Sequence, residues 1–339
     1  MTAPEPSAEP FFILGIETSC DETAAAVVGD GNQVLSSVVS SQLDLHARFG
    51  GVVPEIASRA HVELLSPTVA QALVEAGKEG PQIGAVAATV GPGLASALLV
   101  GVSVGKALSL VWKVPFVGVN HMEGHLYACF LHEPELELPL VALLVSGGHT
   151  LLVHMEDHGC YRVLGTTIDD AVGEAFDKVA RFLGLGYPGG PAIDRISASG
   201  DPQAFDFPRA MEREGYDFSF SGLKTSVTRY ARAHPEADVA DLAASFQRAA
   251  VEVLVSKARR AVDDTGARTL CVGGGVGANT LLRRRIAEVC EQDGVATVIP
   301  TPHLCTDNAA MVAAAAWWRM RADGPTSLEA GVDPNLRLA

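Results

Sequence analysis

Apolar and polar positions follow similar patterns in two parts of the chain. After a proline-rich segment, short apolar runs cover residues 11–16, 24–28 and 32–40, with small and polar residues between them. Three more runs, in the same order, cover residues 138–145, 151–155 and 160–168. Short runs bounded by turn residues are typical of β-strands, and a helical pattern follows each set, at 57–76 and at 169–185. This repetition predicts a duplicated α/β architecture.

The pattern also predicts where the parts of the chain begin and end. We expect a disordered tail at residues 1–10, a first lobe from residues 11–119 and 306–325, a second lobe from residues 120–305, and a C-terminal tail at 326–339. Residues 94–119 are largely apolar, but Lys106, Lys113 and several Gly and Pro residues interrupt them. A membrane span needs about 20 predominantly apolar residues, so the stretch predicts a buried helix followed by a strand.

Composition and charge exclude several classes of protein. Of the 339 residues, 48% are hydrophobic and 19% are charged, which excludes a disordered chain. The net charge of −15 argues against unaided coating of nucleic acid, although a local basic patch remains open. The basic residues are densest at 257–260 and 283–285, where the solvated side of a helix is an alternative interpretation. The six scattered cysteines and the absence of an apolar leader predict a reduced, cytoplasmic protein.

Two histidines have the spacing of a metal site. His121 and His125 stand at i and i+4 of a predicted helix, so both imidazoles lie on one face. Asn120 is placed to cap that helix. A zinc protease of the HExxH type would need a glutamate directly after the first histidine, whereas Glu123 stands at i+2. A metalloprotease is therefore excluded.

The third ligand is predicted near the C-terminus. Asp307 opens a helix, and with two histidines it would complete the set of two histidines and one carboxylate that suits ferrous iron. Cys305 and His303 are rival ligands, and Cys305 would favour zinc. Each of these residues also has an ordinary structural interpretation, as a core histidine or a helix-terminal charge.

A second group of acidic residues forms a stripe on a predicted helix. Asp170, Glu174 and Asp177 stand at i, i+4 and i+7. Like charges so arranged repel one another, which predicts either a solvated face or a bound positive group.

Ten segments in order resemble the TsaD family, the catalytic subunits that form threonylcarbamoyladenosine in tRNA. The resemblance spans residues 11–320 and rests on ILGIETSCDETA, GGVVPEIASRAH, VGPGLASALLVG, NHMEGHLYA, LLVSGGHT, IDDAVGEAFDKVAR, YPGGP, DFSFSGLKT, GGGVGAN and CTDNAAM. It implies a duplicated actin-like and sugar-kinase-like ATPase (ASKHA) fold, with a nucleotide and metal cleft between two lobes. It also implies transfer of threonylcarbamoyl from its adenylate to N6 of adenosine 37 in tRNAs that read ANN codons, with release of AMP.

The resemblance implies site residues, a cofactor and partners. One Fe²⁺ per subunit, with Zn²⁺ as an alternative, is expected on His121, His125 and Asp307. The adenine nucleotide or threonylcarbamoyl-AMP is expected on Leu144, Val145, Ser146, Gly147, Gly148, Asp177, Gly190, Asp194 and Asn279. No catalytic residue is assigned beyond the metal ligands. The expected partners are the tRNA substrate, a TsaB-like paralogue and a TsaE-like ATPase, and no membrane.

Two other functions are compatible with the fold. A sugar-kinase-like phosphotransferase would hold ATP in the same way, but it has no need of the histidine pair. A non-catalytic nucleotide-binding scaffold would not be expected to keep the histidines, SGGHT and CTDN together. The motifs therefore favour the transferase.

Overall fold

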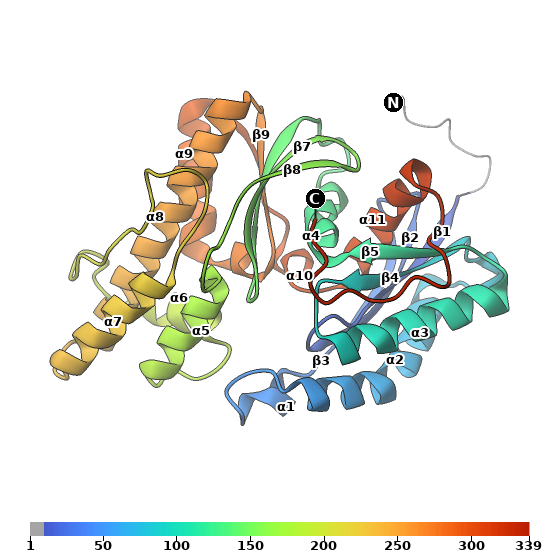
Figure 1. Cartoon of the computed structure of the whole chain (residues 1–339), viewed down its shortest axis with the longest axis horizontal. Helices are drawn as coiled ribbons and strands as arrows, with labels where there is room; N and C mark the ends of the chain where they lie inside the picture. The colour runs from blue at the N-terminus through green and yellow to red at the C-terminus, as the bar shows by residue number, and fades with distance from the viewer. Residues whose placement is uncertain (1–9, 339) are drawn as a thin grey trace. The chain divides into compact units, whose positions relative to one another are not determined.

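The computed structural model describes residues 10–338 and divides them into two compact units (Figure 1). Unit 1 comprises residues 10–45, 52–135 and 307–338, and unit 2 comprises residues 46–51 and 136–306. The predicted disordered tail, apart from residue 10, lies outside the described residues.

Unit 1 is built on a five-stranded sheet with the order β3-β2-β1-β4-β5. Its strands are β1 (Phe12–Glu17), β2 (Glu22–Gly29), β3 (Gln33–Ser41), β4 (Ala85–Gly91) and β5 (Phe116–Asn120). The strands β1, β2 and β3 pair antiparallel, whereas β4 and β5 continue the sheet parallel to β1. The three inner strands β2, β1 and β4 are almost wholly buried, as expected for strands covered on both faces.

Helices cover both faces of this sheet. They are α2 (Pro54–Ala76), α3 (Ala95–Trp112), α4 (His121–His132) and α11 (Ala309–Ala322). The short helix α1 (Leu43–Ala47) crosses the boundary between the units, and the 3₁₀ turn η1 (Gly80–Gln82) precedes β4. Helices α2 and α3 pack side by side on one face, and α4 and α11 pack together on the other (Figure 1). The polar ends of β1 and β5 therefore lie near the start of α4.

The apolar stretch at 94–119 forms the predicted helix and strand, α3 and β5. Among the described residues, α3 has the length and apolarity of a possible membrane span, and a third of it is buried inside the structure. Its inner face, which includes Leu98 and Val102, packs on the sheet. Its outer face carries the exposed side chains Leu99, Leu110 and Val111, so only one face of the predicted buried helix is buried.

Unit 2 contains a second sheet with the order β10-β9-β6-β7-β8. Its strands are β6 (Leu140–Val145), β7 (Thr150–Asp157), β8 (Cys160–Thr166), β9 (Thr269–Gly273) and β10 (Ala296–Val298). The helical segments are α5 (Val172–Phe182), α6 (Gly189–Ser197), α7 (Ser221–Ala233), α8 (Val239–Thr265), η2 (Gly275–Ala278), α9 (Thr280–Asp293) and α10 (Pro302–Cys305). Its core joins the sheet to α5 and α8.

The two sheets have the same topology. In each, the first strand pairs antiparallel with the second and parallel with the fourth, and the fifth strand follows the fourth in parallel. The predicted duplication is thus present in strand order and direction as well as in the sequence pattern.

The observed boundary between the units differs from the predicted one. The sequence places residues 120–135 in the second lobe, whereas α4 packs against α11 and belongs to unit 1. The predicted C-terminal tail, 326–338, is bonded to unit 1: Thr326 N donates to Phe116 O, and Asp333 N donates to Val90 O. The Asn120 side chain also donates to the carbonyl of Arg337 at 3.0 Å. Hydrophobic patterning misses this segment because it contains few apolar residues: Val332 packs on the core of unit 1, and hydrogen bonds supply much of the remaining contact.

Candidate metal centre

Helix α4 begins where β5 ends, and its first residue is His121. Asn120 is the N-cap, and its Oδ1 accepts a hydrogen bond from Met122 N at 2.9 Å, as the sequence predicts. One turn further along the helix, His125 is completely buried. Both imidazoles therefore extend from the same rigid face, close to the end of the sheet.

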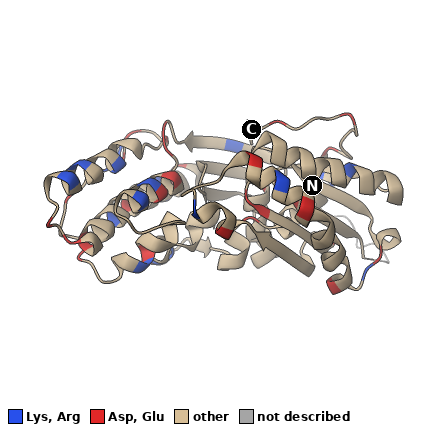
Figure 2. Ribbon diagram, turned by 90° about the horizontal axis from the view of Figure 1, so that it is seen from below, with Lys and Arg blue, Asp and Glu red and all other residues tan. Residues whose placement is uncertain are grey.

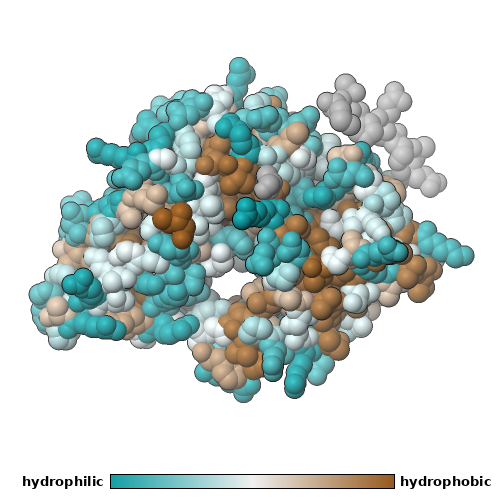
Figure 3. All heavy atoms as spheres, viewed as in Figure 1, coloured by the Kyte–Doolittle hydropathy of each residue, from teal (hydrophilic) through white to brown (hydrophobic). Residues whose placement is uncertain are grey.

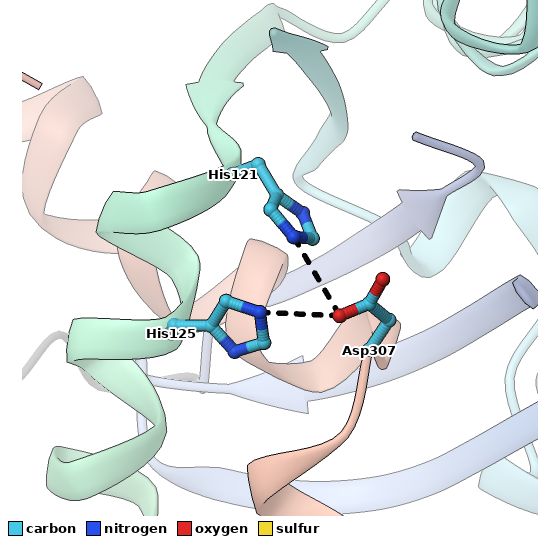
Figure 4. A group of neighbouring side chains, drawn as sticks. All are labelled: His121, His125 and Asp307. Atoms are coloured by element: carbon cyan, nitrogen blue, oxygen red, sulfur yellow. Dashed lines mark ion pairs between the residues drawn. The ribbon is translucent and has the colours of Figure 1, made fainter. Parts of the chain in front are cut away.

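Asp307 meets both histidines from the other end of the chain. It precedes α11, which packs closely on α4: a Cβ atom added to Gly124 would lie 3.2 Å from Met311 Cγ. Asp307 Oδ1 lies 3.5 Å from His121 Nε2 and 3.1 Å from His125 Nε2 (Figure 4). The close helix contact thus brings together three side chains that the sequence separates by more than 180 residues.

The two distances from Asp307 to the histidines are close to those expected around a shared metal ion. One ligand atom from each of the three residues lies within 4.8 Å of the others. Ligand atoms about 2.1 Å from a metal stand roughly 3.0 to 3.4 Å apart in octahedral or tetrahedral geometry. His125 gives independent support, because neither of its ring nitrogens makes a hydrogen bond despite complete burial. Its 3.1 Å approach to Asp307 lacks hydrogen-bond orientation, which a bound cation would explain.

The rival ligands are engaged elsewhere. Cys305 Sγ lies 3.3 Å from Pro300 O, with which it makes a hydrogen bond. His303 is exposed, and its Nε2 lies 3.4 Å from Thr301 Oγ1. Among the described residues, the candidate metal group contains neither of them.

A buried carboxylate orients His121. Glu17, at the end of β1, has no exposed surface, and its Oε2 lies 3.1 Å from His121 Nδ1. The same carboxylate accepts hydrogen bonds from Ser19 N and Thr89 Oγ1, both at 2.6 Å. A histidine that donates Nδ1–H to a carboxylate keeps the lone pair of Nε2 for a metal. The sequence did not predict a role for Glu17. The local signal is a glutamate followed by Thr18 and Ser19 at the end of an apolar strand, a place where polar side chains often form a site.

Negative charge exceeds positive charge around Asp307. Burial lowers the pKa of His121, but the charges of Asp307 and Glu17 outweigh burial and raise it to about 9. Burial and the charges of Asp307 and Asp21 raise the pKa of Glu22 to about 10. The charge of Asp307 contributes to both shifts, and a divalent cation bound between the ligands would offset this negative charge.

In unit 2, the predicted Leu144–Gly148 segment forms the end of β6 and the turn after it. Ser146 N donates to His149 O, and His149 N donates to Ser146 Oγ, so the turn is closed on itself. Gly147 and Gly148 are exposed, and no atom lies within 4 Å of a Cβ added to either. Their backbone is therefore open to a ligand.

The other predicted nucleotide residues of unit 2 form two groups. Asp177 accepts a hydrogen bond from Gly189 N at 2.7 Å, directly before Gly190. Asp194 Oδ1 accepts from Asn279 Nδ2 at 3.1 Å and from Thr280 Oγ1 at 2.8 Å. The Asn279 amide also donates to Gln247 Oε1 at 2.8 Å. Sequence reasoning missed Gln247 and Thr280, and Gln247 has no local signal because it lies within the long helix α8.

The acidic stripe on α5 has positive partners. Asp170 pairs with Lys178 at 2.8 Å and with Lys224, and Glu174 also pairs with Lys178 at 2.8 Å. Burial raises the pKa of Asp170, but its hydrogen bonds to both lysines outweigh burial and hold the pKa below its ordinary value. The stripe is thus balanced within the protein.

Comparison with known proteins gives the family. The model of the TsaD family, described as tRNA N6-adenosine threonylcarbamoyltransferase, matches residues 33–314. The chain belongs to the TsaD family. It is 54% identical over 330 residues to a tRNA N6-adenosine threonylcarbamoyltransferase of Symbiobacterium thermophilum, covering 96% of this chain and 97% of the relative. A relative of the same name from Geobacter sp. strain M21 is 56% identical over 307 residues, covering 89% of this chain and 90% of the relative.

Solved structures support the fold class. HypF of T. kodakarensis superposes with a TM-score of 0.63 at 15% identity, covering 92% of this TsaD-family chain and 48% of HypF. Component A of the Acidaminococcus fermentans (R)-2-hydroxyglutaryl-CoA dehydratase gives a TM-score of 0.56 at 13% identity, covering 92% of this chain and 99% of component A. The duplicated ASKHA fold predicted from the sequence is confirmed.

TsaD-family membership also confirms the predicted activity. The chain is a transferase that forms threonylcarbamoyladenosine in tRNA. The kinase and scaffold alternatives are not favoured.

Proposed function

We propose that this transferase uses a metal ion held by His121, His125 and Asp307, with ferrous iron as the first candidate and zinc as the second. The observation that carries the proposal is the buried histidine pair facing Asp307, with ligand atoms within 4.8 Å of one another. Two histidines and one carboxylate leave coordination positions open, which suits ferrous iron. When bound, the metal supplies a Lewis acid that polarises an oxygen of the threonylcarbamoyl donor.

The nucleophile explains why activation must act on the donor. The N6 amine of adenine is weak because its lone pair is delocalised into the ring. In the proposed reaction, N6 of adenosine 37 in tRNAs that read ANN codons attacks the carbonyl carbon of threonylcarbamoyl-AMP. The bond between that carbon and the phosphate oxygen breaks, AMP leaves with the electron pair, and N6 releases one proton to water. The protein has to hold the donor and stabilise the oxygen and phosphate charges.

Unit 2 supplies groups suited to holding the donor. Of the predicted turn residues Ser146, Gly147 and Gly148, the two exposed glycines can direct backbone N–H groups at an anionic oxygen, because Ser146 N already donates to His149 O. Asp194 and Asn279 hold one another by a hydrogen bond of 3.1 Å, which presets polar atoms for ribose hydroxyls. Leu144, Val145, Asp177 and Gly190 complete the proposed adenine-nucleotide site.

The reaction also requires partners and a cytoplasmic location in this proposal. The chain has a net charge of −15, which weakens its own attraction for a polyanion. The outer surface of α2 and α3 carries apolar residues, among them Val62 and Leu99, beside a groove of about 400 Å³ (Figure 3). This surface supports docking of a TsaB-like paralogue, and a TsaE-like ATPase would supply the nucleotide-driven step.

The test combines metal analysis with a transfer assay. Wild-type protein should contain about one metal ion per chain and should form the modified nucleoside from synthetic threonylcarbamoyl-AMP and unmodified tRNA. His125→Ala and Asp307→Asn should lose both properties. His132→Ala is the matched control, because His132 is an exposed histidine on the same helix. A His125→Ala protein that keeps its metal and its activity contradicts the proposal.

A further inference from the structure

Positive charge is distributed unevenly between the two units. Unit 2 contains 18 of the 25 Lys and Arg residues and 22 of the 40 Asp and Glu residues, so its net charge is −4, against −11 for unit 1 (Figure 2). A polyanion such as RNA would therefore be repelled less by unit 2. The question is which basic side chains of unit 2 are available to it.

The two densest basic segments are largely engaged within the protein. Lys257 has no exposed surface, and its Nζ donates to the carbonyls of Glu214 and Gly215. Arg259 pairs with Asp293 at 2.6 Å. In the second segment, Arg283 donates to Pro300 O at 2.8 Å, and Arg284 and Arg285 both pair with Glu288. These arginines already have acceptors, which reduces what a phosphate could gain.

A different group of basic residues has no carboxylate partner. Arg48, Arg181 and Arg232 are exposed, and none forms an ion pair among the described residues. Two of them lie over exposed aromatic rings: Arg48 Cζ is 4.8 Å from the centre of Phe49, and Arg232 Cζ is 5.2 Å from the centre of Phe182. We call these five residues the arginine–phenylalanine patch.

Direct contacts connect the members of the patch. An Arg181 Nη2 group on α5 donates to the carbonyl of Gly50, which places α5 against the segment that carries Arg48 and Phe49. Phe182 follows Arg181, and its ring meets Arg232 of α7. The segment 46–51, the end of α5 and the end of α7 thus form one continuous surface within unit 2.

We propose that the arginine–phenylalanine patch is a surface on which this enzyme binds its RNA substrate, a proposal that rests on the proposed tRNA modification. An exposed guanidinium group without a carboxylate partner can donate hydrogen bonds to two phosphate oxygens. Phe49 and Phe182 are 51% and 36% exposed, so the ring surface that Arg48 and Arg232 leave uncovered is available to unpaired bases of a single-stranded loop. An acidic protein is the alternative partner for this surface. Its carboxylates would complement the arginines, but it would not need the exposed phenylalanine rings.

The patch resolves the conflict between an acidic chain and an RNA substrate. Salt screens the repulsion between RNA and the acidic residues of unit 1 beyond the Debye length, about 10 Å at 0.1 M salt. Arginine–phosphate contacts act at hydrogen-bond distance and are screened much less. Binding is expected to be weak for the isolated chain and strongly dependent on salt. The experiment therefore measures the salt dependence as well as the affinity.

The first arm titrates a fluorescein-labelled, unmodified tRNA transcript with full-length protein from 50 to 200 mM KCl. The triple variant Arg48→Ala, Arg181→Ala, Arg232→Ala should bind at least tenfold more weakly than wild type. Its slope of log affinity against log salt should fall by about 2 to 3, because each lost phosphate contact contributes about 0.7 to 0.9. Arg48→Glu with Arg232→Glu, which leaves the Arg181–Gly50 hydrogen bond intact, should weaken binding similarly.

The matched control is Arg162→Ala, Arg284→Ala, Arg285→Ala. These three arginines of unit 2 are 58%, 66% and 46% exposed but are paired with glutamates. The control removes the same net charge as the patch variant. Because its arginines are already paired with glutamates, its affinity for tRNA should fall less than threefold. Equal weakening of both triple variants would assign the effect to net charge and overturn the patch, as would unchanged binding by the patch variants or no tRNA binding by wild type at 50 mM KCl.

The second arm separates this proposal from the proposed function. In the transfer assay, the patch variant should raise the KM for tRNA at least tenfold, with kcat at saturating tRNA and metal content close to wild type. Failure of wild-type protein to modify tRNA would count against the proposed function, and the binding arm would still decide the patch. Normal activity with an unchanged KM in the variant would overturn only the patch.

Discussion

Glu17→Gln tests how the fold prepares His121 for a metal. Glu17 Oε2 faces His121 Nδ1 at 3.1 Å and Thr89 Oγ1 at 2.6 Å, while Oε1 faces Ser19 N at 2.6 Å. Glutamine has the same shape but replaces one acceptor oxygen with an NH₂ group. Whichever way the amide is turned, one of its donors faces another donor.

The expected cost is a loss of metal affinity of about tenfold. Hydrogen bonds to charged groups contribute about 1.5 to 3 kcal/mol and neutral ones about 0.5 to 1.5 kcal/mol, and a difference of about 1.4 kcal/mol is tenfold in affinity. If NH₂ faces His121, the ring is driven to carry its proton on Nε2, and that proton has to move before Nε2 can bind a metal. Loss of such an orienting partner typically costs 10- to 100-fold in metal affinity.

The assay is competition between the metal-free protein and a chelator of known affinity, with thermal unfolding measured in parallel. Glu123→Gln is the matched control, because Glu123 is also a buried carboxylate near the start of α4 but pairs with Arg319 at 2.9 Å. The control should keep its metal affinity within about threefold. A Glu17→Gln protein that folds and binds metal as tightly as wild type would refute the proposed role of Glu17.

Three further predictions test the packing, the nucleotide site and the acidic surroundings of the metal centre. Gly15→Ala should destabilise the fold by about 3 kcal/mol in denaturant titrations, because the new Cβ would lie 2.2 Å from the Ala309 carbonyl oxygen; a loss below about 1 kcal/mol would contradict this. Asp194→Ala should weaken AMP binding at least tenfold in calorimetry by releasing Asn279, and unchanged affinity would exclude the proposed ribose contact. Cys20 in the metal-free protein should resist alkylation at pH 8, because burial and the charges of two neighbouring aspartates raise its pKa well above the ordinary value; rapid labelling, located by mass spectrometry, would show otherwise.

The sequence predicts the repeated elements well because their signal is local. Each strand of β1 to β3 and β6 to β8 is a short apolar run between turn residues, and each has its counterpart at the expected place. Likewise, the i and i+4 spacing places His121 and His125 on one face of a helix without any tertiary information. Local periodicity is therefore enough to predict the strands of each half and the shared helix face of the two histidines.

Features that depend on distant contacts are less visible. The sequence assigns α4 to the wrong unit because nothing within residues 120–135 reveals that α11, almost 190 residues later, packs on it. Gln247 lies within a long helix, and only the fold places it beside Asn279. Within the basic segment 257–260, the partner of Arg259 is Asp293 on another helix, which no local pattern reveals.

The contact between α4 and α11 connects packing to chemistry. Asp307 can reach both histidines only because α11 approaches α4 closely at Gly124, where any larger side chain would meet Met311. His121 and His125 are fixed by helix α4, and Asp307 lies in the short bend just before α11, so the packing of the two helices sets where its carboxylate lies. The metal ligands therefore depend on a buried glycine contact, whereas the RNA patch depends on exposed side chains that need no fixed geometry until RNA binds.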